Sequence, residues 1–247
     1  MLNAPHVLLA HYPLKRSSAA IGFVHRTGLG VAGLGTVWQG AAWLGVARQD
    51  KECSIMRIAT ATLQSISPYS QSKFYDVPRV GTRASGTATE TPKDYEIRTW
   101  RERCHTDATG RIVIPPMAFK NCLSEIAKYL SVQIPGKGKS TYTKHFEAGV
   151  MVLEGITLPI TKDEVPGEWL YVPSDGRRGG SKRVPKCFPV ISEWKGGVTF
   201  HILDDVINEE TFMQHLKDAG NFIGIGRFRP RNNGYYGRFA VQSIAWG

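Results

Sequence analysis

Residues 208–246 read NEETFMQHLKDAG, NFIGIGRFRPRNNGYYGR and FAVQSIAW, three blocks of different character. The first block predicts a helix from about Asn208 to Ala219, because Asn208 is a good cap, two glutamates suit the positive helix end and apolar residues share one face. Gly220 is expected to end this helix. The third block predicts a strand over Arg238–Trp246, with alternate residues available for burial. A helix, a glycine-rich loop and a strand are therefore expected to close the chain.

Apolar periodicity and turn residues predict the earlier elements. A strand is expected over residues 56–66, and the clearest helix follows Pro115-Pro116 and ends before Pro135. Further extended segments are predicted at Tyr95–Arg103, Arg111–Ile114 and Tyr142–Leu158, and in a hairpin of Phe188–Trp194 with Val198–Leu203. Residues 67–92 and 162–186 are polar and are predicted to be loop insertions.

Without these insertions, the order of elements is strand, helix, strand, strand, helix, strand. This order predicts an α+β fold of the ferredoxin-like (RRM-like) kind, a split β-α-β arrangement with an antiparallel sheet and two polar loop insertions. The length allows a well-buried core, so residues 56–247 are expected to form a single domain.

Residues 1–55 differ from the rest, with no acidic residue before Asp50. Lys51-Glu52-Cys53 can be encoded as AAG-GAG-TGN, which contains a bacterial ribosome-binding sequence, and Met56 follows after about nine nucleotides. We therefore predict that translation starts at Met56 and that residues 1–55 are a non-native or flexible extension. A membrane anchor over Thr27–Ala47 is the alternative, although its glycines would make a poor apolar helix.

The formal net charge of +10 and the isoelectric point near 9.5 favour a polyanionic partner such as nucleic acid. The four cysteines lie far apart without a C-x-x-C pair, so neither a zinc site nor another metal or cofactor is predicted. Because there is no secretory signal, we expect reduced thiols in a cytoplasmic protein that does not act at a membrane.

The loop between the last helix and the last strand combines three chemistries suited to a single nucleic-acid strand. Glycines allow close approach and can leave N–H groups free for phosphate, arginines bind phosphate oxygens, and aromatic rings can stack on unpaired bases. No acid interrupts the arginines, so a bound anion is expected to relieve their repulsion. The predicted binding residues are Gly224, Gly226, Arg227, Arg229, Arg231, Gly234, Tyr235, Tyr236, Gly237 and Arg238. The alternative is a long hairpin with exposed arginines and core aromatics, Phe228 among them.

Two further basic clusters are predicted to extend this surface if they converge on it in space. One consists of Lys137, Lys139 and Lys144, and the other of Arg177, Arg178, Lys182 and Arg183. Each is equally consistent with a solvated loop. The segment Gly136–Thr141 resembles a phosphate loop, but its glycine spacing is wrong and it follows a helix, so an NTPase is rejected.

The order of elements, ending in Ala219-Gly-Asn-Phe-Ile-Gly-Ile-Gly-Arg227 and Gly234-Tyr-Tyr-Gly-Arg-Phe239, resembles the RAMP superfamily of CRISPR-associated proteins. The resemblance implies a ferredoxin-like domain whose loop glycines, Gly224, Gly226, Gly234 and Gly237, approach guide RNA, as in the backbone subunits of effector complexes. Pro230 and the long gap between the glycine pairs depart from the compact loops of that family. The small size fits a stand-alone relative encoded by a bacteriophage or mobile element.

The favoured function is therefore non-catalytic binding of single-stranded RNA, or single-stranded DNA, with self-association along the strand or with other effector subunits. No catalytic residue is assigned, because His105 and His145 have no identified partner and Asp76 and Asp94 are expected to be solvated loop acids. Two alternatives stay open. One is a metal-independent endoribonuclease of the same fold. The other is a phage-type protein that binds single-stranded DNA or acts in recombination or counter-defence.

Overall fold

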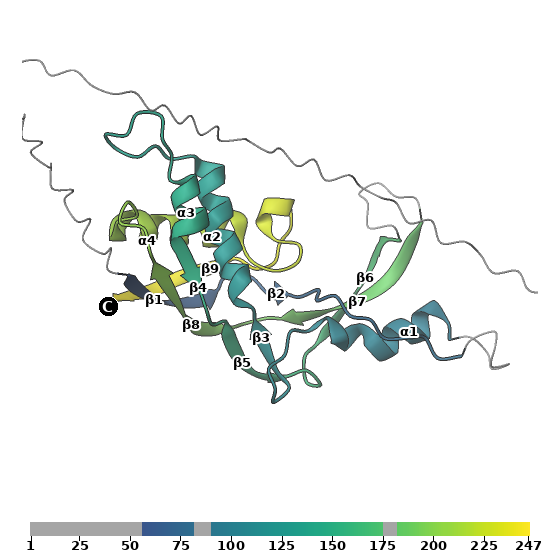
Figure 1. Ribbon diagram of the computed structural model, residues 1–247. Coiled ribbons are helices and arrows are strands. Elements are labelled where there is room, and N and C mark those ends of the chain that lie inside the picture. The colour runs from purple at the N-terminus through teal and green to yellow at the C-terminus, as the bar shows by residue number, and fades with distance from the viewer. Residues whose placement is uncertain (1–55, 82–89, 175–181) are drawn as a thin grey trace, which may run out of the picture. The chain divides into compact units, whose positions relative to one another are not determined.

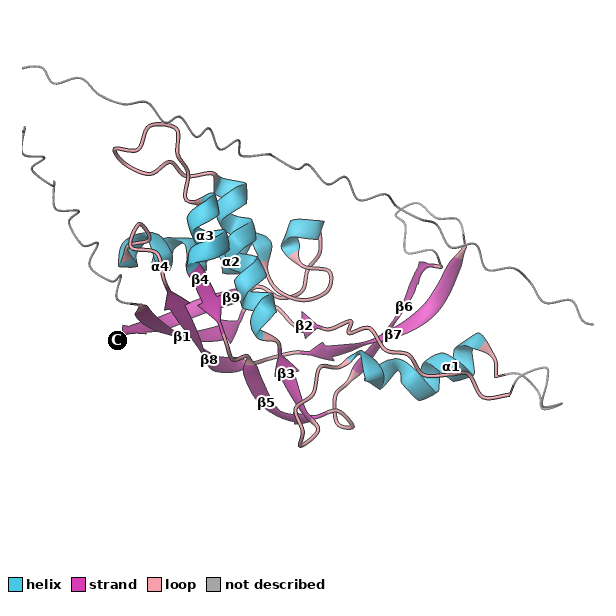
Figure 2. Ribbon diagram, in the orientation of Figure 1, coloured by secondary structure: helices cyan, strands magenta, loops and turns pink. Residues whose placement is uncertain are grey.

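The computed structural model describes residues 56–81, 90–174 and 182–247, so the predictions for residues 1–55 concern residues outside the described part. Its strands are β1 (Arg57–Ser65), β2 (Tyr69–Ser70), β3 (Arg111–Ile114), β4 (Val150–Val152), β5 (Ile156–Thr161), β6 (Gly167–Pro173), β7 (Arg183–Ile191), β8 (Lys195–Ile202) and β9 (Phe239–Trp246). Its helices are α1 (Pro92–Thr99), α2 (Pro116–Leu130), α3 (Thr143–Gly149) and α4 (Glu209–Asp218), with short helical turns η2 (Trp100–Arg103), η3 (Ala219–Ile223) and η4 (Pro230–Asn232) (Figures 1 and 2).

A four-stranded antiparallel sheet in the order β4-β8-β1-β9 forms the largest sheet of the described chain. The predicted first and last strands are confirmed as β1 and β9, which pair with each other. Along β1, Ala59, Ala61 and Leu63 are fully buried, whereas Thr60 and Gln64 are exposed. This period-two pattern gives the sheet one core face and one open face. The fold is α+β with antiparallel sheets, as predicted.

Helices α2 and α4 lie against the core face of this sheet (Figure 1). Phe119 and Leu123 of α2 and Phe212 of α4 are almost completely buried. Phe200 of β8 meets Phe212 edge-on, with ring centroids 5.2 Å apart. Burying each such side chain contributes about 1.5–3 kcal/mol to folding. Asn208 caps α4 by accepting a hydrogen bond from the Thr211 N–H at 2.8 Å, so both predicted helices are confirmed.

The predicted strand over Tyr95–Arg103 is wrong, because this segment forms α1 and η2. Thr91 is the N-cap and its Oγ1 accepts a hydrogen bond from the Asp94 N–H at 3.2 Å. Pro92 occupies the first turn, where its missing N–H costs nothing. These helix-start signals outweigh the short alternation of the segment. Asp94, considered as a cleaving acid, serves in this cap.

The predicted hairpin of β7 with β8 is also wrong. Strand β8 pairs with β1 and β4, whereas β7 pairs with β2 and β6 in a separate three-stranded sheet. The chain passes between the sheets at Trp194, whose side chain is buried and whose carbonyl accepts a hydrogen bond from the Ser65 N–H at 2.9 Å. The two glycines after Lys195 therefore lie within β8 and not in a tight turn.

Residues 162–186 are not a loop throughout, since β6 pairs with β7 from Gly167↔Pro189 to Pro173↔Arg183. A buried ion pair fixes this hairpin to the preceding helical segment. Arg103 Nη1 lies 2.5 Å from Glu96 Oε1, which also accepts a hydrogen bond from the Cys187 N–H. Burial opposes the charge of Glu96, but these hydrogen bonds together lower its pKa. Arg103 is thus a structural cation, not part of a basic surface.

The segment predicted as extended from Tyr142 begins instead with helix α3. Phe146 is fully buried on it, and Lys120 Nζ of α2 donates hydrogen bonds to the carbonyls of Phe146 and Glu147 at 2.8 and 2.9 Å. A helix of seven residues is too short to show its period clearly in the sequence. The extended part is confined to β4 and β5.

Gly220 does not end α4, because the chain continues through the π-helical turn η3 and leaves it at Gly224, where φ is +69°. A Cβ at Gly220 would lie only 2.1 Å from the carbonyl oxygen of Phe239. Gly220 therefore allows η3 to approach β9 closely, and Gly224 provides the left-handed residue that ends the helical segment.

Candidate nucleic-acid interface

The loop of residues 224–238, which we call the arginine loop, folds back on itself between η3 and β9. The Ile225 N–H donates to the Gly237 carbonyl at 3.0 Å, and the Gly237 N–H donates to the Pro68 carbonyl at 2.8 Å. A Cβ at Gly237 would lie 1.8 Å from the Ile225 carbonyl oxygen, and φ there is +78°. Gly237 is therefore required for the two sides of the loop to meet.

The prediction that the loop glycines leave their N–H groups free is wrong for three of the four. Gly224, Gly234 and Gly237 donate to the carbonyls of Ala219, Arg229 and Pro68 at 2.8–3.1 Å. Gly226 differs, since it is exposed, has φ +78°, and its N–H makes no hydrogen bond within the described part of the chain. Only Gly226 among these glycines therefore offers an N–H group to a ligand.

Arg227 is held between two aromatic rings and is half-buried. Its guanidinium carbon lies 3.3 Å from the ring centroid of Phe188 and 4.0 Å from that of Phe228. The backbone N–H of Arg227 donates to the Ser70 carbonyl at 2.9 Å. Burial lowers the pKa of the guanidinium to about 10, so it remains charged at neutral pH. Nη1 is buried with no hydrogen-bond partner among the described residues. Buried polar groups normally have a hydrogen-bond partner, so the unpaired Nη1 makes Arg227 a candidate ligand contact.

The expected repulsion among the loop arginines is reduced by an acid that lies outside the loop. Glu125 of α2 binds Arg229 Nη2 through Oε2 at 2.8 Å and Arg231 Nε through Oε1 at 3.2 Å. Arg231 also lies over the Tyr129 ring at 5.4 Å. The sequence could not reveal this partner, because Glu125 lies more than a hundred residues away on the polar side of a helix.

The two loop tyrosines lie in different environments. Tyr235 is exposed, whereas Tyr236 is half-buried and donates its O–H to Glu168 of β6. Burial and this hydrogen bond raise the pKa of Tyr236 to about 12. Arg238 Nε donates to the Asn221 carbonyl at 3.2 Å. Tyr236 therefore fastens the loop to the β6–β7 hairpin, while Tyr235 and Phe228 present accessible rings.

A cleft of about 580 Å³ opens between the arginine loop, residues 69–72 and the start of α2. Gly226, Arg227 and Phe228 form one side, and Met117 and Asn121 of α2 form the other. The first turn of α2 contains no acidic residue, so its positive dipole end is not offset there. His105 lines the cleft as well, and burial, followed by the charge of Lys73, lowers its pKa.

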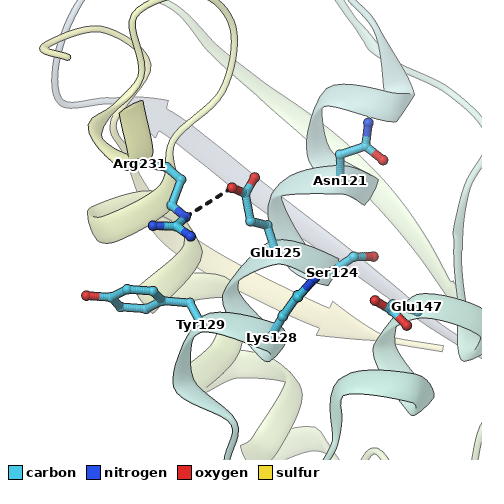
Figure 3. Close-up of a pocket in the computed structure, with 7 residues that line it drawn as sticks. All are labelled: Asn121, Ser124, Glu125, Lys128, Tyr129, Glu147 and Arg231. Carbon is cyan, nitrogen blue, oxygen red and sulfur yellow. Dashed lines mark hydrogen bonds and ion pairs between the residues drawn. The ribbon is translucent and has the colours of Figure 1, made fainter. Parts of the chain in front are cut away.

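A second cavity of about 590 Å³ continues along α2, and Asn121 lines both (Figure 3). Its other lining residues include Glu125 and Tyr129 of α2, Glu147 of α3 and Arg231 of the loop. From Met117 to Tyr129, α2 spans about 18 Å at 1.5 Å per residue. That length corresponds to about five stacked nucleotides at 3.4 Å each. We call the two cavities together the α2 groove.

The three lysines of the cluster line neither cavity of the α2 groove. Their segment, residues 136–144, extends beyond the C-terminal end of α2 (Figure 1). Lys137, Lys139 and Lys144 are exposed. Beside them, His145 Nδ1 and Asp204 Oδ2 lie 2.6 Å apart. Burial opposes the charge of Asp204, but its hydrogen bonds and the charges of His145 and Lys137 lower its pKa.

The third predicted cluster is only partly described, because Arg177 and Arg178 lie outside the described residues. Lys182 and Arg183 lie at the outer end of the β6–β7 hairpin, where Arg183 Nη1 donates to the Tyr171 carbonyl at 3.2 Å. Arg183 is five residues along β7 from Phe188, or about 17 Å. The described basic residues therefore do not form one continuous groove.

Among the described residues, no three His, Cys, Asp or Glu side chains are grouped so as to hold a metal ion. No helix in the described ranges combines the length and apolar character that crossing a bilayer requires.

No family model matches the chain, and a search of curated proteins returns no significant match. Among solved structures, a type III-B Cmr-beta complex bound to cognate target RNA is similar to 77% of this chain at 9% identity, with a TM-score of 0.44. Cmr6 from Pyrococcus furiosus is similar over 74% of this chain and 98% of its own length, at 14% identity and a TM-score of 0.39. A Cas6 product complex is similar over 74% of this chain and 50% of that chain, at 12% identity and a TM-score of 0.27. The chain spans 60% of the length of the matched Cmr-beta chain.

Proposed function

We propose that the chain is an RNA-binding protein that holds a single strand in the α2 groove without cleaving it. The observation that carries this proposal is the half-buried, charged Arg227, whose Nη1 has no partner among the described residues. A buried unsatisfied N–H costs about 1–3 kcal/mol, and an entering phosphate or base oxygen would recover that cost.

The chemistry of the cleft suits a strand with unpaired bases. The Gly226 N–H, which is unpaired among the described residues, the Arg227 guanidinium and the start of α2 are the donors and positive charges for phosphate oxygens. Phe228 is 44% exposed at the cleft and provides a face for one base. By contrast, the open face of the sheet carries Thr60 and Gln64 on β1, not the stacked aromatic residues typical of RNA-binding sheets. We therefore assign the RNA strand to the α2 groove and not to the open face of the sheet.

The proposal extends to the kind of domain. We propose that residues 56–247 form a single ferredoxin-like domain. The connection of β1, β4, β8 and β9 through α2 and α4 and the sheet order β4-β8-β1-β9 support this proposal. The resemblance of the arginine loop to that of RAMP proteins favours RNA over DNA. It also favours assembly with effector subunits, or with further copies along the strand.

The test is a salt titration of binding to single-stranded RNA, single-stranded DNA and duplex. We expect single-stranded RNA to bind best, with a slope of log affinity against log salt of about −0.7 per neutralised phosphate. The double variant Arg227→Ala/Arg229→Ala should lose most of this binding. Equal, weak binding to all three ligands, unchanged in that variant, would remove the proposal, and preference for DNA would redirect it to a DNA-binding role.

A second candidate, a metal-independent endoribonuclease, is favoured by one observation, that His105 lines the same cleft. Its lowered pKa keeps the imidazole neutral near pH 7, as a general base requires. Products that form in EDTA and disappear in His105→Gln, with RNA binding intact, would establish it. Intact RNA after prolonged incubation would leave the non-catalytic function.

A further inference from the structure

Two arginines of the α2 groove, Arg229 from the cleft and Arg231 from the second cavity, converge on one carboxylate. Glu125 binds Arg229 through one oxygen and Arg231 through the other, at 2.8 and 3.2 Å. A phosphodiester also offers two anionic oxygens on a single atom, and guanidinium groups recognise both kinds of anion. The pair of arginines is therefore already arranged around an anion of the same charge as a backbone phosphate.

The position of this cluster matters, because it lies where the α2 groove continues beyond the cleft. Asn121 joins the two cavities, and Glu125 follows one helical turn later on the same side of α2 (Figure 3). A strand that leaves the cleft along α2 meets the Glu125 carboxylate next. In the free protein this carboxylate repels the strand at the point where two arginines would attract it.

Resting on the proposed function, we propose that Arg229 and Arg231 form a second phosphate site, and that Glu125 occupies it until the strand displaces it. The side chains of Arg229, Arg231 and Glu125 are 23%, 46% and 27% exposed. Ion pairs with this much exposure contribute only about 0–1 kcal/mol, so exchanging one anion for another costs little.

The displaced carboxylate has another cation within reach. Lys128 lies three residues after Glu125 on α2 and lines the same cavity. Glu and Lys at this spacing are neighbours on a helix surface. After the exchange, Lys128 is the neighbouring cation for Glu125 and the phosphate is the partner of the two arginines. The negative charge of Glu125 stays on α2 and therefore lowers the affinity for RNA.

The experiment compares Glu125→Gln with Glu147→Gln. Glu147 lines the same cavity and the substitution makes the same change of charge, but neither arginine binds Glu147 in the described structure. We expect Glu125→Gln to bind single-stranded RNA about two- to fivefold more tightly than the wild-type protein, as removal of a partly exposed ion pair implies. Its salt slope should stay the same, because Arg229 and Arg231 bind the same phosphate in both proteins once Glu125 is displaced. Glu147→Gln should not tighten binding.

A double-mutant cycle with Arg231→Gln tests whether the tighter RNA binding of Glu125→Gln depends on the arginine site. In that background Glu125→Gln should give a much smaller gain, because the site it would free is incomplete. Equal gains from both glutamate variants would mean general repulsion only and would overturn the proposal. Weaker binding by a Glu125→Gln protein with an unchanged Tm would also overturn it, because Glu125 would then support the loop instead of competing with the strand.

Failure of this proposal is distinguishable from failure of the proposed function. If the wild-type protein binds RNA and depends on Arg227, but Glu125→Gln has no effect, the strand follows the cleft without using the second site. If the wild-type protein does not bind and Glu125→Gln does not restore binding, both proposals are overturned together.

Discussion

The arginine loop and the turn of residues 136–144 look alike in the sequence and differ in the fold. Both combine glycines at positive φ with a run of basic residues. In the arginine loop, Gly234 and Gly237 lie against backbone carbonyls, and a guanidinium is stacked beside a cleft. In the turn, nothing lies near the Cβ positions of Gly136 and Gly138, and the lysines point into solvent. Basic composition therefore identifies candidate binding segments, whereas packing against neighbouring elements distinguishes an ordered loop beside a cleft from a solvent-exposed turn.

The largest effect should come from Gly237→Ala, compared with Gly138→Ala. At Gly237 the added methyl group meets the Ile225 carbonyl oxygen at 1.8 Å and φ is +78°, so we expect a loss of more than about 3 kcal/mol in the free energy of unfolding. Gly138 has φ +60° and open space, so its loss should be about 1 kcal/mol. Urea unfolding measures both. Equal losses in the free energy of unfolding would mean that the arginine loop is not more tightly packed than the turn.

Arg227→Ala should weaken RNA binding by about 2 kcal/mol, or roughly thirtyfold, since it removes the charged donor beside the cleft. The triple variant Lys137→Ala/Lys139→Ala/Lys144→Ala removes three charges but should weaken binding less than about threefold at 0.15 M salt, because exposed charges beyond the site are screened. Fluorescence anisotropy with a labelled strand gives both values. A larger loss in the triple variant would reverse the comparison.

Phe228→Ala should weaken binding by about 1 kcal/mol, roughly fivefold, because one base loses its stacking face. The matched control is Phe222→Ala, which removes a slightly more exposed ring from η3 that lines neither cavity. The same titration applies, with circular dichroism to confirm that both variants fold. Similar losses at the two positions would count against a defined base contact.

The smallest effect concerns pH. Burial lowers the pKa of His105, so the group is neutral near pH 7 and gains its proton only as the pH falls below the ordinary value of about 6.5. The added positive charge should tighten RNA binding by about twofold between pH 7.5 and 5.5. His105→Gln should abolish this change, whereas His145→Gln, beside the lysine turn, should leave it. If His145→Gln abolishes the pH dependence and His105→Gln leaves it, the RNA lies at the turn of residues 136–144 instead.

The predictable parts of the fold are those whose signals are local. β1, α2, α4 and β9 were predictable because caps and periodicity lie within each segment. The predicted pairing of β7 with β8 was wrong, because nothing within these two adjacent strands indicates that β8 pairs with β1 and β7 with β2 in different sheets. The helix start at Thr91 was a local signal that the alternation of the following residues concealed.

The same distinction applies to the candidate site. The composition of residues 224–238 pointed to a ligand, and Gly226 and Arg227 keep free donors that fit one. Glu125 and Phe188 are brought to the loop from distant segments by the fold alone, so no spacing in the sequence marks them. The lysine cluster lies beyond the C-terminal end of α2, and its three lysines line neither cavity, which no spacing in the sequence shows.

Photo-crosslinking of a 4-thiouridine strand, with the attachment sites mapped by mass spectrometry, tests the central claim most directly. The account predicts crosslinks within residues 226–232 and at the start of α2, between Met117 and Asn121, which form the two sides of the cleft. These crosslinks should disappear in Arg227→Ala. Crosslinks confined to residues 136–144, to the outer end of the β6–β7 hairpin or to the open face of the sheet would contradict it.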